Sequence, residues 1–302
     1  MRMGAAEWMM MLALSLLWGG TFFFVEIALT ELGPFTLVLG RVFLGALTLW
    51  AVVLVSGAKL PRTLVDLRDL AVMGLLNNAI PFTLIFWGQL WITGGLASVL
   101  NATTPIFAVI VAHLLTRDER ATPARTVGVV LGIAGVAVLV GPDAFSGLDG
   151  TLIGQIAVLG AAISYAFAGV FGRRMKRFAA PVAAAGMLTM SSLIMLPVAL
   201  VMEGVPTALP GPGVIAVWLA LGIACTGLAY ILYFRILATA GATNLLLVTI
   251  MIPPSAMALG VIFLGEVFTL PMLAGFGLIF LGLLCVDGRI LDRFRVKPGD
   301  ST

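Results

Sequence analysis

Charged residues are scarce in this chain. Lysine, arginine, aspartate and glutamate make up 10% of its 302 residues, whereas apolar residues make up 61%, and the mean hydropathy is +1.15. A soluble domain carries about 25% charged residues, so the composition excludes a soluble fold. The net charge of +3 is too small to indicate nucleic-acid binding. We therefore expect an integral membrane protein that binds no nucleic acid.

Histidine and cysteine are equally rare. The one histidine, His113, has no second histidine or carboxylate at ligand spacing, so no metal site is predicted. Cys225 and Cys285 both fall inside apolar runs, where we interpret them as small core residues and not as a disulfide. No His-Glu-x-x-His or Gly-x-Ser-x-Gly motif occurs, so the sequence predicts neither an intramembrane enzyme nor a cofactor.

Long apolar runs fill almost the whole chain. A helix that crosses a bilayer needs about 20 consecutive apolar residues, and glycine, proline and charged residues separate runs of that length. The predicted spans are 7–29, 34–56, 67–89, 94–116, 123–141, 150–171, 180–202, 213–235, 243–264 and 270–288. The expected fold is an all-α polytopic membrane protein with ten transmembrane helices.

Basic residues indicate how these helices are oriented. With the N-terminus placed in the cytoplasm, all 17 lysines and arginines except Arg41 fall on the cytoplasmic side, as the positive-inside rule requires. The opposite connections carry acids such as Glu31 and Glu203. We predict that both termini are cytoplasmic, that residues 289–302 form a basic cytoplasmic tail, and that the protein lies in a bacterial inner membrane.

The chain also repeats itself with a spacing of 147 to 148 residues. The matched positions include Trp18 with Tyr165, Phe82 with Tyr230, Pro105 with Pro253 and Glu119 with Glu266. Each half holds five spans, an odd number, so the second half must enter the membrane upside down. The sequence thus predicts two inverted five-helix repeats, residues 1–145 and 146–288, a design typical of carriers with a site at the bilayer centre.

Polar groups and prolines interrupt corresponding spans near the middle of the membrane. Such groups are costly there and tend to face a cavity or another helix. The candidate substrate-binding residues are Trp18, Asn77, Asn78, Phe82, Asn101, Tyr165, Tyr230 and Asn244. Pro105 and Pro253 are the predicted hinges, because proline removes a backbone hydrogen bond and bends a helix.

Each candidate has a purely structural alternative. One of Asn77 and Asn78 could line the cavity, or both could bridge helices, since adjacent helical residues point about 100° apart. Trp18 could face the cavity or pack in the core. Asn101 could bind substrate or mend the backbone beside Pro105.

Glu26 and Arg41 are the only oppositely charged pair that the spans suggest. A structural ion pair joining the first two helices is our favoured interpretation. Proton coupling through Glu26 is the alternative.

Several short motifs resemble those of a known transporter family. Leu17-Trp18-Gly19-Gly20, Gly40-Arg41, Pro105 followed by Asp118-Glu119, and Pro253 followed by Gly265-Glu266 are similar to the paired repeat of the drug/metabolite transporter superfamily, in its EamA-type branch. The resemblance extends through about Asp287. It implies a ten-helix exporter of small metabolites, with aromatic amino-acid exporters among its relatives.

The expected function is therefore export of small neutral or zwitterionic metabolites, most simply amino acids, by alternating access around a central cavity. A multidrug or lipophilic-cation exporter is the alternative, and a channel would need a ring of charges or filter carbonyls that is not evident here. Sugar phosphates would need basic residues that face a central cavity, and by its place in the sequence Arg41 is expected to be peripheral. The expected partners are a small-molecule substrate and the lipid bilayer, and the chain is expected to be a monomer or a homodimer. The fifth and tenth spans carry almost no polar groups, so we expect them to be scaffold.

Overall fold

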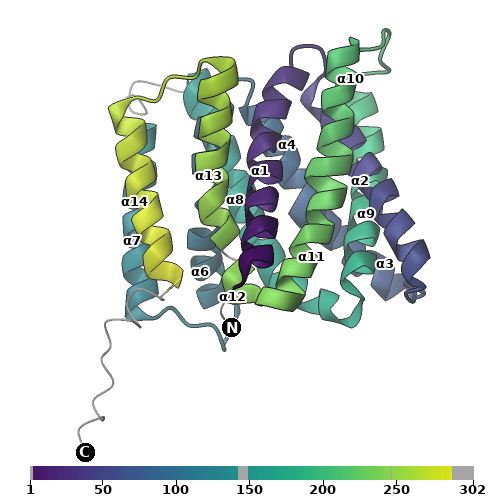
Figure 1. Ribbon diagram of the computed structural model, residues 1–302, viewed down its shortest axis with the longest axis horizontal. Helices are drawn as coiled ribbons and strands as arrows, with labels where there is room; N and C mark the ends of the chain where they lie inside the picture. Colours follow the sequence, from purple (N-terminus) through teal and green to yellow (C-terminus); the bar gives the residue numbers. More distant parts are fainter. Residues whose placement is uncertain (1–2, 142–148, 246, 288–302) are drawn as a thin grey trace, which may run out of the picture.

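The computed structural model describes residues 3–141, 149–245 and 247–287, which form a bundle of helices without strands (Figure 1). Ten helical stretches are long and apolar enough to cross a membrane, which confirms the predicted number of spans. The start of α1 and the end of α14 lie at the same end of the bundle, which we call the cytoplasmic end after the predicted topology; the opposite end is the outer end. The predicted boundary at residues 145/146 and the predicted tail 289–302 lie outside the described residues.

Six spans are single long helices. These are α1 (Ala5–Ala28), α2 (Pro34–Ser56), α7 (Pro123–Val140), α8 (Gly150–Phe171, extended by the 3-10 helix η3, Gly172–Arg177), α9 (Ala180–Met202) and α14 (Leu270–Asp287). Proline occupies the first turn of α2, α7 and α9, where its missing N–H has no helical partner to lose. Side chains of Thr122 and Asp149 cap the first turns of α7 and α8.

The third, fourth, eighth and ninth spans are interrupted. The third consists of α3 (Leu64–Gly74), the π-helix η1 (Leu75–Ala79) and α4 (Ile80–Gly88), and the fourth of α5 (Gly94–Asn101) and α6 (Thr104–Leu115). The eighth consists of α10 (Pro212–Leu219), the π-helix η4 (Ala220–Leu228) and α11 (Ala229–Ala240). The ninth consists of α12 (Ala242–Leu245) and α13 (Leu247–Leu259), on either side of residue 246, which lies outside the described residues, and its interruption is the π-helix η5 (Gly260–Leu264).

Contacts between the two halves of the chain form the centre of the bundle. Helix α1 packs against α13, α2 against α9 and η4, and α8 against α4 and α6. Gly19 lets α1 approach α13 closely, since a Cβ there would collide with Ser255 and with the backbone of Ala256. One buried hydrophobic cluster contains residues from both halves, so the halves share a core.

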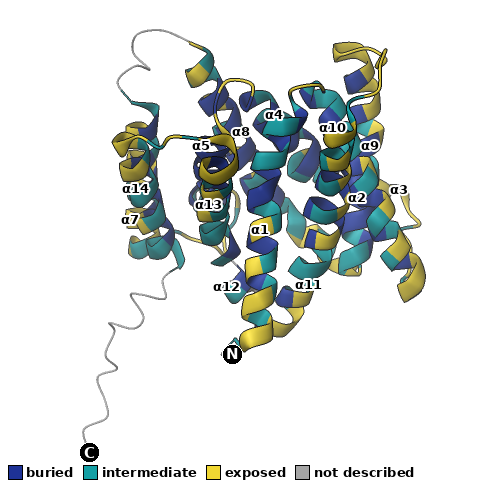
Figure 2. Ribbon diagram, turned by 45° about the horizontal axis from the view of Figure 1, so that its top comes forward, coloured by how far each residue is buried: buried dark blue, intermediate teal, exposed yellow. Residues whose placement is uncertain are grey.

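Helices α7 and α14 form a separate pair at one side of the bundle (Figures 1 and 2). Their backbones approach closely because Gly128 faces Gly282 and Gly135 faces Gly275; a Cβ at any of these positions would meet the carbonyl of the facing glycine. Many of their other side chains are exposed. This arrangement agrees with the scaffold role that we expected for the fifth and tenth spans.

We predict that Gly275→Leu destabilises the protein, because the added side chain must push into Leu139 and the carbonyl of Gly135. Overpacking of this kind costs about 1–3 kcal/mol. Gly277→Leu is the matched control on the same helix, since a Cβ there meets nothing. Thermal unfolding in detergent should show a lower Tm for Gly275→Leu alone, and equal Tm values for the two variants would contradict the glycine interface.

Candidate functional site

The π-helix η1 in the third span carries Asn77 and Asn78. Pro81 accounts for this π-helical turn, because its ring would collide with the carbonyl of Asn77 in a regular α-helix. The N–H of Ile80 instead reaches the carbonyl of Leu75, five residues back. A π-turn of this kind is frequent at functional sites because it changes the direction of the side chains that it carries.

These two asparagines bond to residues of the second half. Asn77 Nδ2 donates to the Tyr230 hydroxyl (3.1 Å), and that hydroxyl is 3.5 Å from Asn78 Oδ1. Asn78 is fully buried, and its Nδ2 donates to Ser191 Oγ (3.3 Å) on α9. We call Asn77, Asn78, Ser191 and Tyr230 the central cluster. Asn78 thus bridges helices, whereas Asn77 is half-buried and accompanies Tyr230.

The predicted ion pair of Glu26 and Arg41 is wrong. Arg41 is only 5% exposed, and its Nε donates to Thr226 Oγ1 (2.9 Å) on η4. Glu26 instead accepts the N–H of Gly94 (3.0 Å). Arg41 also lies deeper than its place in the sequence suggested, because α2 and η4 pack closely through Gly45 and Gly222 and enclose it.

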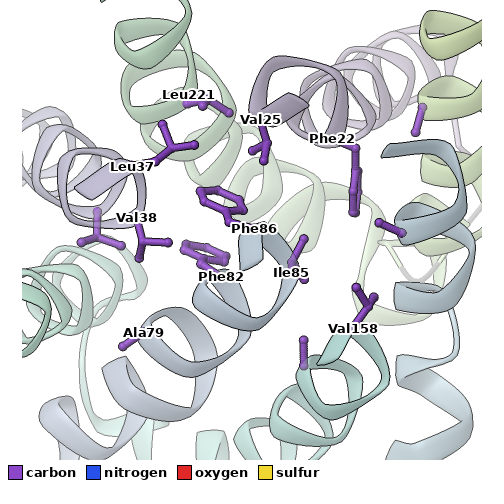
Figure 3. Close-up of a cluster of buried hydrophobic side chains, with 14 of the residues drawn as sticks. Phe22, Val25, Leu37, Val38, Ala79, Phe82, Ile85, Phe86, Val158 and Leu221 are labelled. Carbon is purple, nitrogen blue, oxygen red and sulfur yellow. The ribbon is translucent and has the colours of Figure 1, made fainter. Parts of the chain in front are cut away.

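Phe82 and Phe86 form an aromatic face beside Arg41. The two rings are nearly parallel, with centroids 6.3 Å apart, and lie between the apolar side chains of α1 and α2 (Figure 3). The Arg41 guanidinium carbon is 3.9 Å from the Phe82 ring centre, a cation–π contact. Phe82 therefore contacts Arg41 and lies in the core, and it comes from the same span as the asparagines of the central cluster.

The other aromatic candidates lie at increasing distance from this centre. Tyr165 is half-buried and packs against the core. Trp18 is half-buried and packs against a second buried cluster toward the cytoplasmic end, where its ring lies 5.7 Å from that of Tyr233. Tyr233 is in turn 6.5 Å from the Tyr230 ring, so aromatic contacts connect Trp18 with the central cluster.

Asn244 lies apart from the central cluster. Its Nδ2 donates to the carbonyl of Ala240 (2.8 Å), which ends α11 just before the start of α12. The bond satisfies a carbonyl at the end of a helix, a local structural role.

The break in the fourth span differs from the prediction. Helix α5 ends at Asn101 and α6 begins at Thr104, so Pro105 lies in the first turn of a new helix, where it removes no hydrogen bond. The hydroxyls of Thr103 and Thr104 donate to the carbonyls of Leu100 and Asn101. The threonines, and not the Asn101 side chain, thus mend the backbone. Asn101 Oδ1 is buried and has no hydrogen-bond partner among the described residues.

Two carboxylates hold the outer end of α5. Glu266, from the connection before α14, accepts the N–H of Gly95 (3.2 Å) beside the Glu26–Gly94 bond. Burial is the main cause that raises the pKa of Glu266, and the neighbouring Glu26 adds to it. A Cβ on Gly95 or Gly260 would collide with the Glu266 carboxylate. Sequence analysis did not predict this pair, although the glycines at 94 and 95 are its signal.

Arginines of η3 form ion pairs at the cytoplasmic end. Arg173 contacts Asp118 (2.8 Å) and Glu119 (2.7 Å), and Arg177 contacts Asp66 (3.1 Å) and the buried Asp69 (2.9 Å). The basic run 173–177, interpreted from sequence as a topology signal, therefore also joins the second half of the chain to the first.

The raised pKa of Glu266 predicts a pH-dependent stability. Because the folded protein holds this proton more tightly than the unfolded chain, the stabilising contribution is present at pH below the usual carboxyl value of 4.5 and is lost as pH rises through the raised value. Thermal unfolding between pH 4 and pH 8 should show this loss in the wild type and a flatter profile in Glu266→Gln. Glu31→Gln, at the same end of the bundle, should keep the wild-type profile, and an unchanged profile in Glu266→Gln would count against the shift.

A bundle of ten spans, several of them interrupted near buried polar side chains, is typical of a polytopic membrane transporter. The chain belongs to the EamA-like transporter family, whose model matches it twice, at residues 6–141 and 152–286. The resemblance expected from sequence is thereby confirmed.

Similar proteins support this assignment. A Bacillus subtilis (strain 168) protein described as an uncharacterized transporter, YoaV, is 26% identical over 90% of this chain and 93% of its own length. An Escherichia coli (strain K12) protein described as an uncharacterized inner membrane transporter, YedA, is 29% identical over 95% of this chain and 92% of its own. A probable terminal-alkyne amino-acid exporter of Streptantibioticus cattleyicolor is 29% identical over 46% of each chain.

A crystal structure at 20% identity covers 97% of this chain and 100% of its own with a TM-score of 0.69, which shows the shared fold. The names of the relatives point to transport as the role of this protein.

Proposed function

We propose that this protein exports small neutral or zwitterionic metabolites, most simply amino acids, across a bacterial inner membrane by alternating access. The observation that carries the proposal is the central cluster, in which Asn77 and Asn78 of the first half bond to Tyr230 and Ser191 of the second. Amides and hydroxyls can match an ammonium and a carboxylate, and the nearby rings offer apolar surface. One relative is described as a probable amino-acid exporter, which favours the same substrate class.

The inverted repeat is part of the proposal, and contacts at the two ends support it. At the outer end Glu26 of α1 lies beside Glu266. Positions 147 residues away from these two are Arg173 and Glu119, which form an ion pair at the cytoplasmic end. The same two structural positions therefore meet at opposite ends of the bundle, as two inverted halves require.

The two ends differ in one respect, which supports a carrier closed at its outer end. Helix α5, at the outer end, packs against both α1 and α13. Its counterpart α12, at the cytoplasmic end, packs chiefly against its chain neighbours α11 and α13 among the described residues. We propose that these contacts exchange in the opposite state, so that α5 leaves α1 as α12 moves toward α8.

The interrupted fourth and ninth spans are the proposed moving parts. The chain changes direction at Ala102 and Thr103, just before Pro105, and Pro253 and Pro254 lie inside α13. Residues at the ends of elements absorb the backbone rotation when packed helices move. Pro105 thus acts as a hinge by preventing a continuous helix across the break between α5 and α6, and Pro253 acts as a hinge within α13, where its missing N–H removes a helical hydrogen bond.

Export of lipophilic cations is the weaker alternative. The buried Arg41 would repel a cation placed near Phe82, and no carboxylate in the described part of the chain forms an ion pair with it. Glu26 and Glu266 are the acids that bond to the proposed moving helix α5, so they could carry a proton there, and both lie at the outer end.

The proposed function is tested by counterflow into proteoliposomes. Vesicles loaded with one unlabelled amino acid should accumulate its labelled form transiently and with saturation, because a carrier exchanges substrate through its central site. Screening the twenty amino acids would identify the substrate. Linear, unsaturated uptake would indicate a channel, and absence of uptake for every compound would reject amino-acid export.

Replacing Pro105 tests the hinge. Pro105→Ala should lower the turnover rate about 10-fold while it changes the KM less than about 3-fold, because alanine allows α5 and α6 to join into one helix and the break is needed for motion and not for binding. Pro197→Ala is the control, since Pro197 lies inside the uninterrupted α9. Equal turnover of Pro105→Ala and the wild type would remove Pro105 as a hinge.

A further inference from the structure

Arg41 is a buried cation without a counter-ion. Its side chain is 5% exposed, and no ion pair of the described residues includes it. The titratable groups that interact with it are Tyr165, Cys225 and Tyr230, none of which is a carboxylate. A buried charge is costly unless an opposite charge accompanies it, so this position needs a functional reason.

The guanidinium is held in one orientation. Thr226 Oγ1 donates its own proton to the carbonyl of Leu221, so its lone pairs are left to accept from Arg41 Nε (2.9 Å). One face of the guanidinium lies over the Phe82 ring, 3.9 Å from its centre. These contacts use the Nε edge and one face, and no hydrogen bond of the described residues reaches the two Nη atoms.

The residues around Arg41 belong to the proposed substrate site. Tyr165 and Tyr230 are half-buried, so both side chains keep some accessible surface. Side chains that are deep in a protein but still accessible are expected to face an internal space. Tyr230 is a member of the central cluster, so Arg41, Phe82 and the cluster come together from α2, the third span and the eighth span.

We propose that Arg41 binds the carboxylate of the transported substrate through its two Nη atoms. The planar fork of a guanidinium matches the two oxygens of a carboxylate, and an orientation fixed beforehand reduces the entropy lost on binding. One arginine neutralises one negative charge, so the substrate class is a monocarboxylate, such as a zwitterionic amino acid, and not an amine or a phosphate ester. This inference rests on the proposed function and narrows its substrate class.

The test compares matched compounds. Counterflow and thermal-stability shifts in detergent are measured with apolar amino acids, with the primary amines that lack only their carboxylates, and with the acids that lack only their amino groups. The wild type should transport, and be stabilised by, the compounds that carry a carboxylate. Arg41→Gln should lower their apparent affinity about 30-fold or more, the loss typical of removing one partner of a buried charge pair.

Two further variants separate binding from folding. Arg235→Gln removes an exposed arginine from α11 and should leave affinity unchanged. Thr226→Val keeps the charge of Arg41 but frees its Nε, so the KM for carboxylates should rise while the Tm without ligand stays within a few degrees of that of the wild type. If Arg41→Gln does not fold, Thr226→Val and the wild-type preference for carboxylates over amines decide the question.

Two outcomes would overturn the proposal: equal transport or stabilisation by amines and carboxylates in the wild type, or an equal loss for both classes in Arg41→Gln. Carboxylate-specific stabilisation that depends on Arg41 without any transport would support the site and reject the exporter function. Transport of amines alone would support an exporter and reject the carboxylate site.

Discussion

Inside a bilayer the backbone must satisfy its own hydrogen bonds, and the rest of this structure depends on how that constraint is met where the helices are interrupted. Pro81 forces a π-turn in the third span, and the carbonyl of Leu75 finds a partner in the N–H of Ile80. At the break of the fourth span, Thr103 and Thr104 supply hydroxyl donors. Each interruption is therefore stable without water, and it leaves polar side chains available at the middle of the membrane.

The polar side chains in turn connect the two halves of the chain. The bond of Asn77 to Tyr230 and the bond of Arg41 to Thr226 both cross from the first half to the second, and both involve a π-helical segment. These directional bonds fix how the two halves meet, whereas the apolar contacts around them are non-directional. The outer end is different, because there Glu266 and Glu26 hold the first turn of α5.

Much of the fold could be predicted because bilayer thickness and apolar composition leave few alternatives: the ten spans follow from hydropathy, and the glycines within the fifth and tenth spans allow the close approach of α7 and α14. The partners of the side chains at the candidate site were harder to predict from the sequence than the spans. Arg41 was assigned to Glu26 by proximity in sequence, but side-chain direction depends on which helix packs against it, and η4 proved to be that helix. Asn101 was considered a repair residue, whereas the threonines beside it are closer to the open carbonyls.

Sequence alone determined the membrane class, the number of spans and the positions of the polar residues and prolines within them. These features depend only on the order of residues along the chain. Tertiary structure decided which polar groups meet. The approach of α2 to η4 through Gly45 and Gly222 buries Arg41 beside Phe82 and away from any acid, a result that no local pattern contains. The physical reason is that the energy of a buried charge depends on neighbours that are distant in the chain, as Thr226 is from Arg41.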